Sequence, residues 1–178
     1  MLVLALLLAA CGGTQSSSQF GEVPLVISGE PGADDAGLFL ATQRGYDTAE
    51  GVKLEVERTG RADFRIVSSP PSGCVVVLAI VRPDKRVLCA DEITLQDERD
   101  KVLAVARALK RGYLQAQLEP EEAVAAMTEA DPSLDREQLS RALDDAVATW
   151  TAGADYFGEL APGPGRDPSI ARDAATDS

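Results

Sequence analysis

The segment Cys74–Val81, CVVVLAIV, is an unbroken run of apolar and mostly β-branched side chains. A strand with one solvent-facing side alternates apolar and polar residues, whereas an unbroken run is typical of a strand covered on both faces. Turn residues precede it in Pro70–Gly73, and the RPDK segment follows it before the short apolar strand Arg86–Asp91. The chain is therefore expected to build a sheet with other layers packed against it.

A strand-helix-strand unit is predicted upstream of this run. Val23–Ser28 is an apolar strand, Asp34–Gly45 is a short helix, and Val52–Arg58 alternates as a half-buried strand does. Such a unit predicts two parallel strands joined by a crossover. With a further strand within Arg61–Ser69, we expect a mixed sheet of four or five strands.

The C-terminal half is predicted to be helical. Apolar residues recur at three- and four-residue spacings over Asp97–Gln117, Pro120 opens a second helix, and Asp131–Gln138 opens a third. The third carries a core-facing stripe, made of Leu139, Leu143, Val147 and Trp150. About four helices are therefore expected in all, followed by a Pro/Gly/Asp-rich tail from Pro162 that is predicted to be frayed.

The first eleven residues, MLVLALLLAAC, are too short to span a membrane and read as a signal segment. The small residues before Cys11 resemble the bacterial lipobox, in which the cysteine is acylated. The alternative is a buried N-terminal strand or helix. The organisation expected is a signal peptide over 1–11, a flexible tether over 12–21, one α/β domain over 22–161 and the tail over 162–178.

Charge and composition exclude several classes of function. The formal net charge is −12, so no basic surface is available to neutralise a phosphate backbone, and nucleic acid is not expected as a partner. The chain contains no histidine, which excludes Ser-His-Asp and Cys-His catalytic sites. No Cys/His spacing of a zinc site occurs, and neither a metal nor a cofactor is expected.

Cys74 and Cys89 lie in two strand-like runs. They can form a disulfide if those strands are neighbours. The alternative is two small buried hydrophobic residues, and we favour it because buried free cysteine is common.

The segment Gly29–Gly37, GEPGADDAG, connects the first strand to the first helix. It lacks the glycine spacing of a dinucleotide fold and the Gly-Lys-Ser/Thr ending of a P-loop. Its carboxylates would also repel a phosphate group, so nucleotide binding is not expected here. Acids at a helix start are usually caps, although paired carboxylates can also do acid/base work. A ligand-binding role is the other interpretation, because open α/β sheets bind ligands beyond the carboxyl ends of their strands, and a cationic or hydrogen-bond-donating ligand suits these acids. The candidate ligand contacts are Gly29, Glu30, Gly32, Asp35 and Asp63, the last of which is alternatively a solvated acid at a strand end.

Two stretches resemble one family. VPLVISGEPGADDAGLFLATQRGYDTAEGVKLEV, from Val23, resembles the opening of ABC-transporter substrate-binding proteins of the alkanesulfonate and thiamine-pyrimidine type, and GRADF looks like a short segment that follows it there. RALKRGYLQAQLEPEEAVAAMTEADPSLD is similar to a later helix pair of that family. The matching positions are Pro31, Gly37, Phe39, Ala41, Gly45, Tyr46 and Gly51 in the first stretch, and Arg107, Ala108, Arg111, Gly112, Tyr113, Pro120, Glu121 and Ala123 in the second.

This resemblance implies a type II periplasmic-binding-protein fold. It implies a lipid-anchored, extracytoplasmic solute-binding protein that passes a small organic ligand, such as a thiamine-type pyrimidine or a sulfonate, to ABC permease subunits. The family carries most of its second lobe where this chain has only Arg65–Cys89, about 25 residues, fewer than the roughly 40 that a stable domain requires. We therefore expect an α/β protein reduced mainly to one lobe.

The same comparison bears on the site and on the class of function. The family's ligand-contacting aromatic, Asn and His positions fall here on Gly29, Gly32 and Asp35. Because the fungal enzymatic branch depends on histidine, no enzymatic activity is expected. The alternative function is that of a truncated or decayed paralogue, or a surface interaction module, without solute binding. A small hydrolase would need a nucleophile-base pair that the sequence does not offer.

Overall fold

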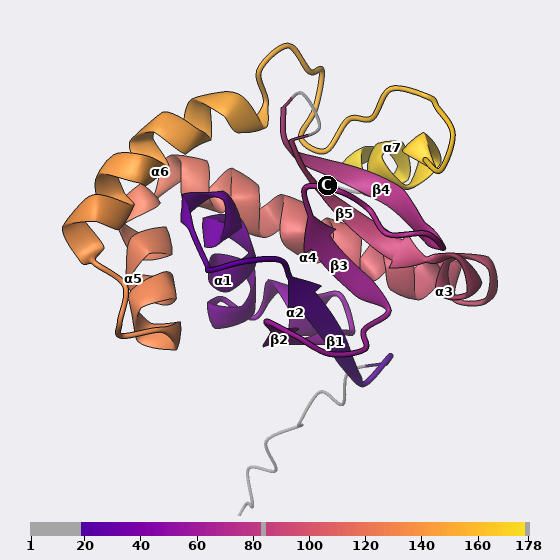
Figure 1. Ribbon diagram of the computed structural model, residues 1–178, viewed down its shortest axis with the longest axis horizontal. Helices are drawn as coiled ribbons and strands as arrows, with labels where there is room; N and C mark the ends of the chain where they lie inside the picture. Colours follow the sequence, from indigo (N-terminus) through magenta and orange to yellow (C-terminus); the bar gives the residue numbers. More distant parts are fainter. Residues whose placement is uncertain (1–18, 83–84, 177–178) are drawn as a thin grey trace, which may run out of the picture.

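The described residues form a five-stranded mixed sheet, with strand order β2-β1-β3-β5-β4 (Figure 1). The computed structural model describes residues 19–82 and 85–176, so the predicted signal segment and Cys11 lie outside the described residues. The strands are β1 (Glu22–Ile27), β2 (Lys53–Glu57), β3 (Phe64–Val67), β4 (Cys74–Val81) and β5 (Arg86–Asp91). The α-helices are α1 (Ala36–Gln43), α2 (Tyr46–Ala49), α3 (Glu92–Asp97), α4 (Arg99–Leu118), α5 (Pro120–Ala130), α6 (Arg136–Trp150) and α7 (Pro168–Thr176), and a 3₁₀ turn, η1, spans Ala33–Asp35.

The pairing of the strands follows the sequence pattern. β1 is parallel to β2, as the crossover predicts. β1 is also parallel to β3, which the sequence did not predict, while β5 is antiparallel to β3 and to β4. The described part of the chain holds this one sheet, in agreement with the expected single lobe. More helices form than the four expected, because α2, α3 and α7 are additional short elements. None of the described helices is long and apolar enough to cross a membrane.

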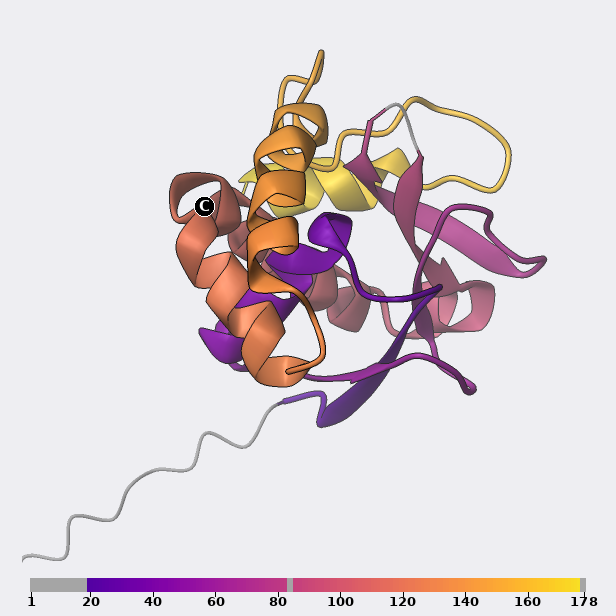
Figure 2. The same ribbon diagram turned by 60° about the vertical axis from the view of Figure 1, so that its left-hand side comes forward.

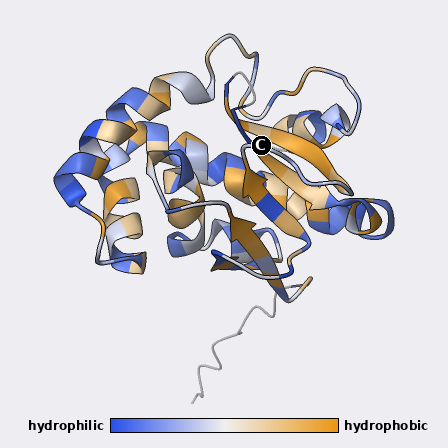
Figure 3. Cartoon of the chain, in the orientation of Figure 1, coloured by the Kyte–Doolittle hydropathy of each residue, from blue (hydrophilic) through white to orange (hydrophobic). Residues whose placement is uncertain are grey.

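The unbroken apolar run of β4 is covered on both faces, as predicted. Val77 and Ile80 join the main core with the helices, whereas Val76 and Ala79 join a smaller cluster that includes Leu160. Figure 3, coloured by residue hydropathy, shows hydrophobic residues concentrated in the strands and hydrophilic residues along the outer helices. β4 is an edge strand, and the loop before α7 covers its free edge.

The predicted frayed tail is wrong, since the segment from Pro162 to α7 is docked on the sheet. The amide of Val76 donates to the carbonyl of Gly165 at 2.9 Å, and Ile170 in α7 is fully buried. Lys110 Nζ donates to carbonyls at the end of α7, where a cation suits the helix dipole, and Arg99 pairs with Asp167 at 3.2 Å. The Pro/Gly composition that suggested fraying instead lets the chain turn along the edge of β4.

The two stretches that resemble the transporter family pack against each other. Gly37 in α1 faces Gly112 in α4 so closely that a Cβ added to Gly112 would lie 2.1 Å from the Gly37 carbonyl oxygen. A Cβ on Gly37 would in turn meet the ring of Tyr113 at 2.3 Å. Nearby, the Arg111 guanidinium lies over the Tyr46 ring, 4.5 Å from its centroid. These matching positions therefore hold α1 and α2 against α4, which is a role in the fold.

Candidate functional site

The hinge, Gly29–Asp35, leaves the sheet at the carboxyl ends of two parallel strands. The amide of Ser28 still donates to the carbonyl of Ile66 in β3, at 3.0 Å, and then Gly29 turns the chain with φ +83°, a left-handed conformation that favours glycine. Because β1 and β3 are parallel, their carboxyl ends share this edge. Figure 2 shows the hinge passing beside α6 before it enters α1.

Asp35 is the buried anchor of the hinge, with 1% of its surface exposed. Its Oδ1 accepts hydrogen bonds from Nε and Nη2 of Arg86, at 2.9 and 2.6 Å, and its Oδ2 accepts from the amide of Gly32 at 3.1 Å. Burial raises the pKa of Asp35, although Arg86 and the Gly32 amide work in the opposite direction. Arg86 lies at the start of β5, so this pair ties the hinge to the β4–β5 hairpin.

Acids at a helix start are usually caps, but neither Asp34 nor Asp35 caps the amides of α1 with its side chain. Asp35 occupies the N-cap position of α1 without a side-chain bond to its amides, and it accepts instead from the upstream amide of Gly32. Asp34 is held through its backbone, because its carbonyl accepts the hydroxyl hydrogen of the buried Tyr113 at 2.6 Å. Asp34 also lines a cavity between the hinge and α6.

A groove lies between the hinge and α6, in two adjoining compartments. The charged compartment has a volume of about 530 Å³ and is lined by hinge residues, by Lys85 and Arg86, and by the α6 residues Ala142, Asp145, Ala146 and Thr149. The apolar compartment, of about 330 Å³, lies between the start of the hinge and the loop from α5 to α6. Gly32, Ala33 and Ala142 line both compartments. We call the two together the hinge groove.

The structure brings together some of the predicted contact residues and not others. Glu30, Gly32 and Asp35 line the charged compartment, whereas Gly29 lines neither compartment. Glu30 is exposed and forms an ion pair with Arg58 at 2.8 Å.

Asp63 lies apart from the hinge because it precedes β3 while the hinge follows the parallel strand β1. Its carboxylate pairs with Lys101 at 3.2 Å, and Lys101 also contacts Glu98. The alternative interpretation of Asp63 as a solvated strand-end acid describes this placement better, since nearly half of its side chain is exposed.

The groove also contains residues that the sequence did not single out. Arg86 follows the β4–β5 turn, and nothing in its local sequence indicates that it reaches Asp35. Asp145 and Ala142 lie on α6 beside the core stripe, and only the packing of that helix against η1 brings them to the hinge. The helical spacing predicted which face of α6 is buried. It did not predict that the residues beside that face lie against η1.

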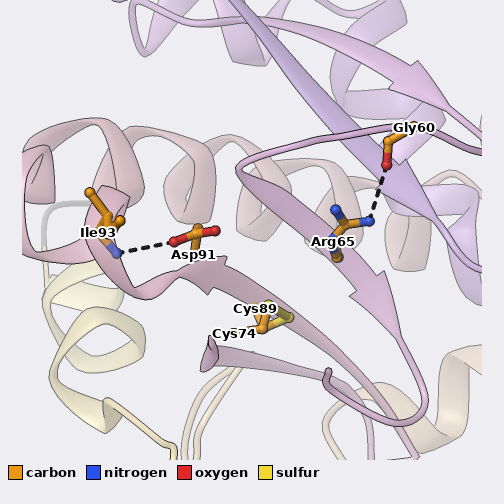
Figure 4. The surroundings of a disulfide bond; sticks show 6 residues. All are labelled: Gly60, Arg65, Cys74, Cys89, Asp91 and Ile93. Carbon is orange, nitrogen blue, oxygen red and sulfur yellow. Dashed lines mark hydrogen bonds between the residues drawn. A yellow bond between two sulfur atoms is a disulfide. The ribbon is translucent and has the colours of Figure 1, made fainter. Parts of the chain in front are cut away.

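Cys74 and Cys89 form a disulfide, so the favoured alternative of two free buried cysteines is wrong. The Cα atoms are 5.6 Å apart on the neighbouring strands β4 and β5, within the range that a disulfide requires. Figure 4 shows the bond bridging the two strands near Arg65 and Asp91. A separate cavity of about 290 Å³ lies at this place, at the opposite end of β3 from the hinge.

Comparisons with known proteins decide the fold. A scan against protein-family models finds no match, and no curated protein matches the chain. Among solved structures, the chain is similar to the Candida albicans CA3427 gene product, described as defining a new family with the generic periplasmic-binding-protein structural fold. The TM-score is 0.55 at 9% identity, over 86% of this chain and 88% of the other. This chain has a periplasmic-binding-protein-like fold.

That fold confirms the predicted class, an α/β protein with a mixed sheet, and at 9% identity it carries no information on ligand or transport. In this periplasmic-binding-protein-like chain, β4 passes directly into β5 between Val81 and Arg86. The hinge groove is therefore bounded by α6 and this hairpin.

Proposed function

We propose that this chain is a solute-binding lipoprotein of an ABC-type importer, and that the hinge groove holds its small organic ligand. One observation carries the proposal: on a periplasmic-binding-protein-like fold, the groove opens beyond the carboxyl ends of β1 and β3. Ligands of open α/β sheets bind at this edge. The proposal includes no reaction and no cofactor.

The proposed location is the extracytoplasmic face of the cell membrane, through acylation of Cys11. The disulfide between Cys74 and Cys89 supports it, because disulfides persist mainly in oxidising compartments. In that setting the ligand would pass to ABC permease subunits, as the family resemblance implies. Thiamine-type pyrimidines and sulfonates are the ligands that the resemblance names.

A second candidate function is a surface interaction module without solute binding. It is favoured by the single sheet of the described residues, which leaves the groove without an opposing lobe, and by the internal use of Asp35 by Arg86. Under this alternative the hinge is a structural connection only.

Blocking the groove separates the two functions. Ala142 lines both compartments, so Ala142→Phe places a ring where they join, whereas Ala148 is exposed on the same helix and lines neither compartment. The purified full chain and both variants are tested by thermal shift against thiamine-type pyrimidines, alkanesulfonates and alkylamines, since a ligand of the native state raises its apparent stability. We expect a compound that stabilises the wild type and Ala148→Phe but not Ala142→Phe. If no compound stabilises the wild type, or if Ala142→Phe responds fully, solute binding in the groove is refuted.

A further inference from the structure

We infer that the ligand of the hinge groove is an elongated organic cation, with an ammonium head in the charged compartment and an aliphatic tail in the apolar one. The inference rests on the proposed function and specifies its ligand class. The two compartments adjoin through residues that line both, so one molecule can occupy them together. The chemistry of each compartment defines one end of that molecule.

The apolar compartment suits a hydrocarbon. Pro31 and Ala33 of the hinge face Leu134, Leu139 and Ala142 of the α5–α6 loop and α6, and the compartment contains one acid, Asp135. The carboxylate of Asp135 is already used, because it accepts the amide of Gln138 at 2.8 Å as the cap of α6. Ser133 and Gln138 also line the compartment, so apolar residues make up most of its lining but not all of it.

A salt-bridge pair joins the two sides of the groove at this end. Arg58 donates to Glu30 at 2.8 Å on the hinge side and to Asp131 at 2.5 Å on the α5–α6 side. Glu30 directly precedes Pro31, and Asp131 lies two residues before Ser133, both of which line the apolar compartment. Arg58 thus bridges the hinge and the α5–α6 loop at this end of the groove.

The charged compartment suits a cation, because the charged side chains that are not paired with each other are mostly acidic. Asp35 is neutralised by Arg86, and Glu30 is paired with Arg58. The remaining charged groups that line the compartment are Asp34, Asp145 and Lys85, none with an ion pair to another described residue. Two carboxylates therefore outnumber one ammonium at the place where the head would lie.

The charge of the whole chain acts in the same direction. Its formal net charge of −12 repels an anion approaching an open groove and attracts a cation. A sulfonate head would meet Asp34 and Asp145 with one lysine to offset them. An alkylamine head finds two acceptors there.

Calorimetric titration with n-alkylamines from propyl to octyl, and with alkyl sulfonates and alcohols of matched length, tests the inference. We expect amines to bind more tightly than both matched series. Each added methylene is expected to tighten amine binding about fourfold until the compartment is filled, because burying one methylene is worth about 0.8 kcal/mol.

Three variants locate the two ends. Asp145→Asn should weaken amine binding about fivefold, while Asp144→Asn, the exposed neighbour outside the groove, should leave it unchanged. Leu134→Ala should reduce the gain per methylene without changing the preference for amines.

The outcomes distinguish this inference from the proposed function. Sulfonates or alcohols binding as tightly as amines, or amines binding without dependence on chain length, would overturn the inference. If such ligands are still blocked by Ala142→Phe, the groove remains a solute site and only its ligand class is wrong. If none of these compounds binds, the inference is overturned, whereas the proposed function falls only if the thermal-shift test with pyrimidines also fails or if Ala142→Phe blocks no ligand.

Discussion

At the scale of residues, Asp35 and Arg86 decide the shape of the hinge. The side chains are 2% and 12% exposed, and the guanidinium contacts the carboxylate through two nitrogen atoms. Arg86 also points toward the carbonyl of Ser28, so it joins the end of β1, η1 and β5. Asp35 is thus an anchor that positions the groove rather than an acceptor left open to a ligand.

Removing the cation of this pair should destabilise the fold strongly. We expect Arg86→Met to lower the free energy of unfolding by about 3–5 kcal/mol, because it leaves a buried carboxylate without its partner. Arg65→Met on β3 is the matched control, since the Arg65 guanidinium makes one long contact, 3.5 Å to the carbonyl of Gly60, and a change within about 0.5 kcal/mol is expected. Urea unfolding measures both. Equal losses in the two variants would contradict the anchoring role.

A second buried acid, Asp47, should make the stability of the fold depend on pH. Its carboxylate accepts the amides of Leu54 and Thr48, at 3.0 and 2.7 Å, yet burial raises its pKa above the ordinary value of 3.8. A folded-state pKa above the unfolded one means that the native state holds the proton more tightly, so the stability from this group is present at low pH and lost as pH rises through the folded pKa.

The variant Asp47→Asn does not titrate at this position, so it isolates the effect. We expect the stability advantage of the wild type over Asp47→Asn to shrink as pH rises from about 3 to about 7. Urea unfolding across that range measures it, with exposed Asp144→Asn as the control whose difference from the wild type stays constant. An advantage that grows with pH would show that the two amide donors outweigh burial.

At the scale of elements, α1 and α4 cross at two facing glycines, Gly37 and Gly112. The glycines at their crossing allow the two backbones to come into contact. Beside the crossing, the hydroxyl of Tyr113 donates a hydrogen bond to the carbonyl of Asp34. The ring of Tyr113 is also stacked with Phe157 and edge-on to Trp150, with both centroids at 4.9 Å. The helix pair thus connects the core to the hinge.

Adding one methyl group at this crossing should therefore be costly. We expect Gly37→Ala to lower the free energy of unfolding by about 1–3 kcal/mol or more, because its Cβ would overlap the Tyr113 ring. Gly163→Ala is the control, since the nearest atom to its Cβ is the flexible Arg166 side chain at 3.4 Å. Thermal unfolding compares them, and equal midpoints would contradict the packing role.

Most elements could be predicted from the sequence, because each depends on a local pattern. The parallel β1–β2 pair, the hairpin of β4 and β5, and the long helix α4 all follow from periodicity and turn residues. The helix α7 could not, since it is held by partners distant in the sequence: Arg99 on α4 contacts Asp173, and Lys110 donates to the carbonyl of Ala174. The groove-lining flank of α6 was missed for the same reason, as it depends on where a helix packs and not on its own spacing.

At the scale of the whole molecule, the question is where in the cell this chain acts. The proposed extracytoplasmic location is supported by the disulfide, because disulfides persist mainly in oxidising compartments. The sequence adds the lipobox-like run that ends at Cys11, which lies outside the described residues. Among the described residues, no helix is long and apolar enough to cross a membrane.

The thiol of Cys11 is the group on which such an anchor depends. We expect Cys11→Ser, expressed as the full chain in a bacterial host, to lose incorporation of an alkyne-labelled fatty acid and to move from the membrane fraction to the soluble fraction, because acyl chains supply the binding energy that holds a lipoprotein at the bilayer. The control is the pair Cys74→Ser and Cys89→Ser, which removes the disulfide and should lower stability by about 2–4 kcal/mol while leaving acylation unchanged. Fatty-acid labelling that persists in Cys11→Ser would contradict the anchor. The chain would then have to reach any permease by diffusion, and the importer role would lose its proposed attachment to the membrane.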